Sequence, residues 1–79
     1  MKLSQKSKVL VNKNALLSFL SKNDMSVIDL AKNMNVAPST IYRAIDDKNP
    51  KGVGGETIAN MLRALGLKEK DFQKVFIFN

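Results

Sequence analysis

The stretch VIDLAKNMNVAPSTIYRAI, residues 27–45, decides the fold of this 79-residue chain. Its first half has apolar residues at helical spacing, and Ser26 with Asp29 three residues later predicts a capping box at the start of a helix. Asn35 tolerates the left-handed backbone with which a helix often ends, and Pro38 suits the first position of the next helix. The stretch therefore predicts two helices separated by a turn of about three residues.

Four positions in this stretch have steric roles that their residue types fit. Ala31 is small where the second helix crosses the first, and Asn35 takes the turn conformation. Val36 fills the gap between the helices, and Ile41 buries the second helix against the first. This spacing of Ala31, Asn35, Val36 and Ile41 resembles the helix-turn-helix motif of the Cro/repressor family, also called the xenobiotic-response-element family.

The resemblance covers residues 12–73 and implies the five-helix order of a lambda-repressor-like domain. A first helix follows the cap Asn12, a fourth ends at Gly66, and a short fifth one is expected within residues 68–74. Residues 8–11 and 75–78 are strand-like and would stabilise each other by pairing. We expect a mainly α, single-domain fold over residues 1–79, with the helix-turn-helix at 26–46 and a small two-stranded sheet from the two ends.

The chain departs from the family pattern at three positions. The family usually has Gln at the first motif position, where it contacts a phosphate, and this chain has Val27. The usual turn glycine is Asn35, and the usual Ser cap of the second motif helix is Ala37. The first change removes one expected phosphate contact, whereas the backbone tolerates the other two.

A second turn, Leu65-Gly66-Leu67, precedes the expected fifth helix and is the other candidate for the DNA-reading turn. Leu62 is too bulky for its helix-crossing position, and Glu69 and Asp71 would repel DNA phosphates. The turn at Asn35 is therefore the better candidate.

Helical geometry predicts which side chains of the second motif helix reach DNA. Ile41 points inward with Ala44 and Ile45. Arg43 suits bidentate contact with a guanine edge, while Tyr42 suits a thymine methyl group or a phosphate. The predicted base-contacting set on this helix is Ser39, Thr40, Tyr42 and Arg43. Asp46 and Asp47 are interpreted as a solvated helix end rather than as cytosine readers.

The resemblance implies that the loop that follows and the start of the fourth helix approach the phosphate backbone, so we expect phosphate contacts at Lys48, Asn49, Lys51 and Thr57. The glycine-rich segment 52–55 either presents amides to a phosphate or simply connects two helices. It does not fit a nucleotide-binding loop, because no strand precedes it and no Gly-Lys-Ser/Thr follows. The N-terminal lysines Lys2, Lys6, Lys8 and Lys13 form either a DNA-contacting arm or solubilising charges on a strand.

The C-terminal aromatic residues Phe72, Phe76 and Phe78 either complete a small core or form a dimer surface. Alternation along residues 75–78 gives both faces of the expected strand apolar side chains, which indicates that both faces are covered. Related small repressors with strands at both ends are dimers, so the resemblance implies a homodimer with these three residues as interface candidates.

Composition narrows the function further. Thirteen Lys and Arg against seven Asp and Glu give a net charge of +6, which favours a polyanionic partner. The absence of His and Cys excludes zinc fingers, disulfides and the usual catalytic triads, so we expect no metal, no cofactor and no enzymatic activity. No apolar run exceeds four residues, and no basic amphipathic helix collects the lysines, which argues against a membrane segment or partner.

Together these features predict a cytoplasmic, sequence-specific regulator of transcription that binds double-stranded DNA as a homodimer on a pseudo-palindromic operator. The analogy is to a phage or mobile-element repressor that acts by operator occupancy, with half-sites about 34 Å apart and no small-molecule ligand. The alternative is an antitoxin-like or anti-repressor module that keeps the fold and binds another protein. Val27 and the Asp46-Asp47 pair motivate this alternative.

Overall fold

The computed structural model describes residues 9–78, which form five helical segments and one two-stranded sheet. The elements in chain order are β1 (Val9–Val11), α1 (Lys13–Lys22), α2 (Val27–Met34), α3 (Pro38–Ala44), α4 (Gly55–Leu65), the 3-10 helix η1 (Glu69–Lys74) and β2 (Phe76–Phe78). The strands pair antiparallel, with Leu10 opposite Ile77. The mainly helical fold and the terminal sheet predicted from the sequence are confirmed.

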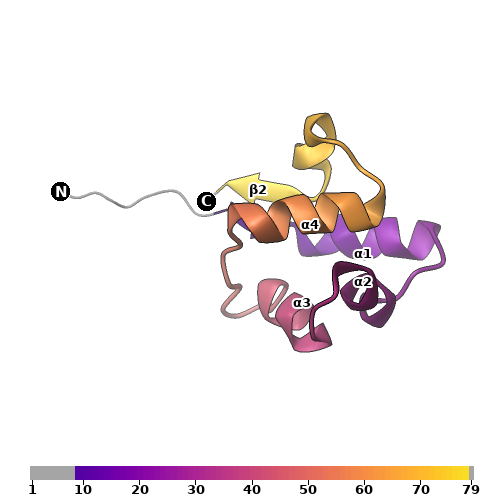
Figure 1. Ribbon diagram of the computed structural model, residues 1–79. Helices are drawn as coiled ribbons and strands as arrows, with labels where there is room; N and C mark the ends of the chain where they lie inside the picture. The colour runs from indigo at the N-terminus through magenta and orange to yellow at the C-terminus, as the bar shows by residue number, and fades with distance from the viewer. Residues whose placement is uncertain (1–8, 79) are drawn as a thin grey trace.

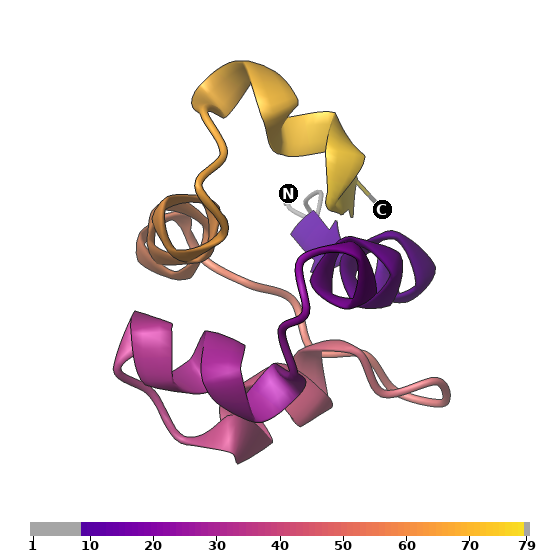
Figure 2. The ribbon, with the colours of Figure 1, turned by 90° about the vertical axis from the view of Figure 1, so that its right-hand side faces the viewer.

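The elements form three levels (Figures 1 and 2). Helices α1 and α4 lie side by side in the middle, α2 and α3 lie against one side of them, and the sheet with η1 lies on the other side. Helix α2 packs against both α3 and α4. This arrangement places α3 at the opposite end of the molecule from η1 and the sheet.

The core fills the space between these levels. Its apolar residues come from every helix except η1 and from both strands: Val11, Leu16, Leu20, Leu30, Ala31, Met34, Ile41, Ala44, Ile45, Met61, Leu62, Leu65, Val75 and Phe76. Within the described residues the core contains no buried polar or charged side chain, so apolar burial holds the levels together.

Local sequence explains where α2 begins and ends. The Ser26 hydroxyl accepts a hydrogen bond from the Asp29 amide at 3.0 Å, and the Asp29 carboxylate accepts one from the Ser26 amide at 3.0 Å. Asn35 adopts φ 60° and ψ 43°, and the Val36 amide donates to the Ala31 carbonyl at 3.0 Å. The predicted capping box and left-handed turn are therefore confirmed.

The other predicted caps are also present. The Asn12 side chain accepts from the Ala15 amide at 3.2 Å at the start of α1. Gly66 ends α4 with φ 74°, and the Leu67 amide donates to the Leu62 carbonyl at 2.8 Å, as in a Schellman motif.

Two elements differ from expectation. Helix α3 ends at Ala44, whereas the predicted helix-turn-helix extends to residue 46. The Asp46 carboxylate accepts hydrogen bonds from the amides of Lys48 and Asn49. These bonds form a turn, which competes with continuation of the helix. The fifth helix is a 3-10 helix, in which each hydrogen bond joins residues three positions apart. One example is the bond from the Asp71 amide to the Lys68 carbonyl at 2.8 Å.

One anchoring contact has no signal in the local sequence. The Asn60 side chain on α4 donates to the Met34 carbonyl at 2.8 Å, across 26 residues of chain. Met34 is the last residue of α2, so this bond fixes the end of α2 from which the turn departs. The helix-turn-helix is thus tied to α4 by a hydrogen bond as well as by apolar packing.

Candidate nucleic-acid interface

The second motif helix, α3, presents a polar face to solvent. Pro38 occupies its first turn after Ala37, whose backbone is extended as at other helix starts. Ile41 and Ala44 are buried against the rest of the core. The side chains predicted to contact bases all belong to exposed residues: Ser39, Thr40, Tyr42 and Arg43. The structure therefore brings the four together on one accessible surface.

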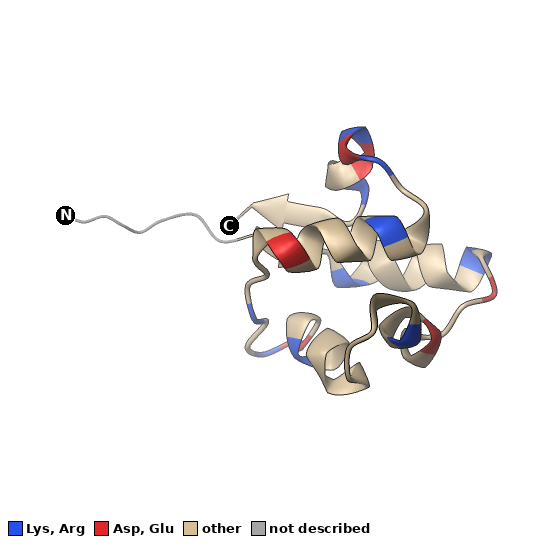
Figure 3. Ribbon diagram, viewed as in Figure 1, with Lys and Arg blue, Asp and Glu red and all other residues tan. Residues whose placement is uncertain are grey.

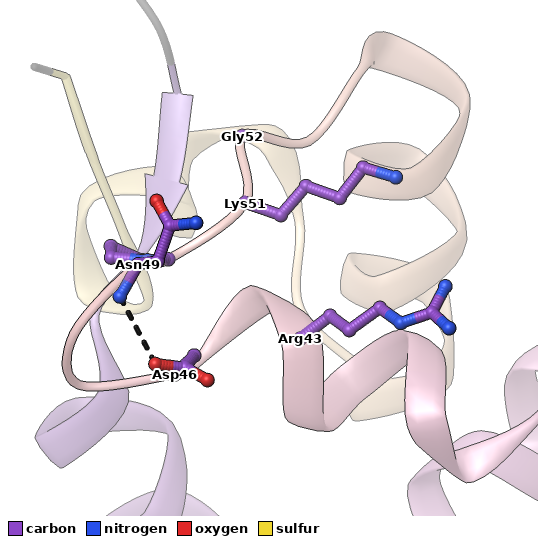
Figure 4. Close-up of a pocket in the computed structure, with 6 residues that line it drawn as sticks. Arg43, Asp46, Asn49, Lys51 and Gly52 are labelled. Carbon is purple, nitrogen blue, oxygen red and sulfur yellow. Dashed lines mark hydrogen bonds between the residues drawn. The ribbon is translucent and has the colours of Figure 1, made fainter.

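The loop after α3 places a second cation beside this surface. The Lys51 amide donates to the Arg43 carbonyl at 3.1 Å, which fixes the Lys51 backbone next to the last turn of α3. The Arg43 and Lys51 side chains extend in the same direction, one from the helix and one from the loop (Figure 4). Thr40, Arg43, Lys51 and Thr57 line a shallow hollow of about 290 Å³ between α3 and α4.

The start of α4 closes this hollow on its far side. Its N-cap is Gly54, which provides no side-chain hydrogen bond to the first-turn amides. A side chain added at Gly54 or Gly55 would meet nothing within 4 Å, so both glycines border open space at the start of α4. Uncapped amides at a helix N-terminus favour an anion such as a phosphate, although Glu56 in the first turn opposes one.

A comparison with known protein families decides what this arrangement is. The model of the Cro/C1-type helix-turn-helix DNA-binding domain matches residues 15–75. The chain belongs to this family. No curated protein and no solved structure matches the chain. As a Cro/C1-type domain, it has a helix-turn-helix of the DNA-binding kind, formed by α2 and α3.

In this Cro/C1-type domain the charge is widely distributed. Lys and Arg lie on each of the helices and along the loop after α3 (Figure 3). Near α3 the described cations are Arg43, Lys48 and Lys51, all exposed. The earlier lysines Lys2, Lys6 and Lys8 lie outside the described residues, so their role stays a prediction. Among the described residues the cations are therefore spread over all the helices, and those near α3 are one part of this distribution.

Asp46 and Asp47 are both exposed just after the end of α3, as expected for a solvated helix end, and both also have structural partners. Asp46 lies beyond the helix, and its Oδ1 accepts from the amides of Lys48 at 2.8 Å and Asn49 at 3.0 Å. Both Asp47 oxygens accept from the Lys13 ammonium group on α1, at 2.9 and 2.8 Å. The two acids shape and anchor the loop that carries Lys51.

The hydrogen bonds from the Asn49 and Lys48 amides lower the pKa of Asp46 below its ordinary value. A lowered pKa in the folded state means that the folded protein resists protonation, so Asp46 stabilises the fold above about pH 4 and loses this effect as the pH falls through the folded-state pKa. We expect Asp46→Asn to make the melting temperature less dependent on pH between about pH 5 and 3, because an amide oxygen still accepts both bonds without titrating. Thermal melts of both proteins across this range provide the measurement, and equal slopes would contradict the assignment.

The position where the family usually carries a phosphate-binding Gln lies beside an apolar cleft. Val27 lines a hollow of about 520 Å³ with Leu17, Tyr42 and Ile45. Leu17 and Tyr42 are 37% and 53% exposed, so apolar groups are accessible next to the reading helix. The same hollow is also lined by the charged residues Lys13, Asp46, Asp47 and Lys48, so Val27 itself offers an apolar contact where the family usually has a polar one.

The three C-terminal phenylalanines have different environments. Phe76 is 1% exposed and belongs to the core, so it is not available as a surface contact. Phe72 stacks on Phe76 with ring centroids 5.1 Å apart and lies 5.5 Å from Phe78. Phe78 is 67% exposed and Ile77 45% exposed, so the sheet has an accessible apolar surface in the single chain. The expectation that both faces of the strand are covered stays a prediction, because the single chain does not cover them.

Residues 9–78 show neither a metal-binding group of acidic or sulfur side chains nor a helix long and apolar enough to cross a membrane.

Proposed function

We propose that this chain is a sequence-specific transcriptional regulator that reads double-stranded DNA with α3. The observation that carries the proposal is the hydrogen bond from the Lys51 amide to the Arg43 carbonyl. It sets a base-reading guanidinium and a phosphate-binding ammonium side by side on one exposed surface (Figure 4). Contacts to base edges give sequence specificity, and contacts to phosphates fix the position of the protein along the duplex. A sequence-specific DNA-binding domain therefore needs both kinds of side chain at a fixed separation.

The division of roles follows from side-chain chemistry. Arg43 donates two parallel hydrogen bonds to the O6 and N7 acceptors of guanine in the major groove. Ser39 and Thr40, at the N-terminal end of α3, donate to base edges or to the backbone. Tyr42 contacts a thymine methyl group or a phosphate, and its 53% exposure leaves the ring accessible for either.

The phosphate contacts come from both sides of the hollow beside α3. Lys48, Asn49 and Lys51 approach from the loop, and Thr57 approaches from α4 together with the uncapped amides at its start. In this proposal the glycine segment presents amides to a phosphate rather than simply connecting two helices, because no side chain caps the first amides of α4.

The regulator acts as a homodimer on a pseudo-palindromic operator, in the manner of a phage or mobile-element repressor. The exposed Phe78 and Ile77, with Phe72 beside them, support a dimer surface at the sheet. Half-sites would lie about 34 Å apart, and occupancy of the operator in the cytoplasm would exclude polymerase or a competing regulator. No cofactor and no catalytic step are needed. Sedimentation at several protein concentrations measures the monomer–dimer equilibrium. A protein that stays monomeric at every concentration would contradict the proposed homodimer.

The alternative function is a protein-interaction module on the same fold. The apolar cleft of Leu17, Val27, Tyr42 and Ile45 favours it, because such a surface suits an apolar side chain of a partner. The acidic pair no longer favours it, since Asp46 and Asp47 are engaged within the loop.

Selection from a random duplex library separates the two functions. A regulator enriches a defined operator and retards it in a gel at low salt. A module that has lost DNA binding retards neither the selected duplexes nor random genomic fragments, and that result would replace the proposed function with the alternative.

Lys51→Ala is expected to weaken binding to all duplexes about equally. An ammonium group on a phosphate releases counterions without reading sequence, so its loss reduces the slope of log K against log salt by about one unit. Anisotropy titrations at four salt concentrations, with the selected operator and a scrambled duplex, provide the measurement. Lys70→Ala in η1, far from α3, is the matched control and is expected to keep the wild-type slope (Figure 1). A sequence-dependent loss with Lys51→Ala would reassign Lys51 to a base edge.

A further inference from the structure

The segment between α3 and α4, residues 45–54, is fastened to three other elements. Asp47 is bound to Lys13 at the start of α1. The Lys51 amide is bound to the last turn of α3 through the Arg43 carbonyl, and the Val53 amide donates to the Val9 carbonyl of β1 at 2.9 Å. Only the first of these attachments is made by side chains, so it is the one that substitutions can remove without changing the backbone.

The Lys13–Asp47 ion pair has a geometry that favours a real contribution to loop position. Its two nitrogen–oxygen distances are 2.9 and 2.8 Å, so the ammonium group contacts both carboxylate oxygens. The pair borders the hollow that Leu17 and Tyr42 line, and its side chains are 37% exposed for Lys13 and 77% exposed for Asp47. An exposed pair of this kind contributes at most about 1 kcal/mol, which is about fivefold in an equilibrium constant, so its effect is expected on the position of the loop rather than on the stability of the fold.

Both partners also occupy positions that their charge disfavours. Lys13 is the first residue of α1, where the helix dipole favours an acid, and the first turn of α1 contains none. Asp47 lies three residues beyond the end of α3, on the side of the molecule that would approach phosphates. A negative charge there opposes DNA binding by itself. The pairing accounts for both placements.

We propose that Lys13 and Asp47 are a positioning pair that holds the loop so that Lys51 meets a phosphate while Arg43 meets its base. Neither residue contacts DNA in this role. The proposal rests on the function proposed above, since it concerns the geometry of that same DNA-binding surface. It makes Asp47 an acid that improves binding to a polyanion.

The sign of one substitution separates positioning from simple electrostatics. If Asp47 acted only through its charge, Asp47→Ala would tighten DNA binding, because it removes a repulsion. If Asp47 positions the loop, the same substitution weakens binding by about two- to fivefold, the range that an ion pair of this kind supports. The salt slope is also expected to fall toward the slope of Lys51→Ala, although no lysine has been removed.

Three variants complete the experiment, which uses anisotropy titrations with the selected operator. Glu69→Ala removes an acid from η1, at the end of the molecule away from α3, and is expected to bind as tightly as wild type or slightly more tightly (Figure 1). Lys13→Ala breaks the same pair from the other side and is expected to weaken binding. The exchanged variant Lys13→Asp/Asp47→Lys restores the pair at constant net charge and is expected to recover binding to within about twofold of wild type.

Each outcome has one meaning. Wild-type protein that binds no duplex removes the proposed function itself. Wild-type binding with an Asp47→Ala variant that binds as tightly or more tightly, at an unchanged salt slope, overturns the positioning role alone. A general loss of folded protein lowers the active fraction and the melting temperature but leaves the salt slope unchanged, so the slope distinguishes loop position from stability.

Discussion

Phe76→Ala is expected to destabilise the fold by about 3–5 kcal/mol, the largest effect of any single substitution considered for this chain. Phe76 is 1% exposed and stacks on Phe72 at 5.1 Å, so truncation leaves a cavity as well as losing apolar burial. Small domains have about 5–15 kcal/mol of stability, and this chain of 79 residues is expected at the low end. The melting temperature should fall by at least about 12 °C, which a thermal melt monitored by circular dichroism measures.

Phe78→Ala is the matched control, because it truncates the same residue type two positions along β2. Phe78 is 67% exposed, so its loss costs little more than its contact with Phe72, about 1.5 kcal/mol at most. If the exposed aromatic forms the proposed dimer surface, Phe78→Ala shifts the monomer–dimer midpoint in sedimentation to higher concentration. A Phe76→Ala variant that melts within a few degrees of wild type would show that Phe76 is not a core residue.

This pair of substitutions illustrates a limit of sequence reasoning. Phe76 and Phe78 alternate correctly onto one face of β2, and the pattern does not distinguish them. Their difference arises because the core ends between them: the strand's first residue is covered by the helices, and its last residue extends past them. Where a strand ends relative to the core depends on tertiary packing. The sequence therefore predicts the three interface candidates, but it does not show which of them are buried and which are exposed.

The local features were predictable because each depends on residues a few positions apart. Ser26 and Asp29, which form the capping box, are three residues apart. Asn35 adopts a left-handed backbone because its short polar side chain tolerates that conformation. Such signals determine where α2 and α3 begin and where the turn lies. The sequence alone therefore predicts the helix-turn-helix and the exposed face of α3.

The contacts that position the site were not predictable, because they join residues far apart in the chain. Lys13 and Asp47 are separated by 34 residues, and Asn60 and Met34 by 26. In the sequence Asp46 and Asp47 are simply two acids after a helix. Only the fold shows that one forms a turn and the other reaches α1. What the sequence presents as a charge opposed to DNA binding is, in the structure, part of how the loop is held.

Arg43→Ala is expected to weaken binding to the selected operator by about 1–3 kcal/mol, which is about 5- to 150-fold, and to relax selectivity at one base pair. The guanidinium fork pairs with two acceptors of one guanine, so its loss removes the preference for that base and leaves the other positions unchanged. Because Arg43 is exposed, its truncation is expected to leave folding intact, and an unchanged melting temperature checks this. Anisotropy titrations with the operator and each single-base variant, at one salt concentration, measure the change.

Two control variants separate the effect of the guanidinium geometry of Arg43 from the effect of its positive charge. Arg43→Lys keeps the charge but not the fork, so it is expected to retain binding to scrambled duplexes while losing most of the selectivity. Arg63→Ala removes the same group from the last turn of α4 and is expected to preserve selectivity, since Arg63 bonds to Asn60 within its own helix. If Arg43→Ala weakened operator and scrambled duplexes equally, Arg43 would be a phosphate contact. Selectivity would then have to come from Ser39, Thr40 and Tyr42, which are the remaining predicted base contacts on the exposed face of α3.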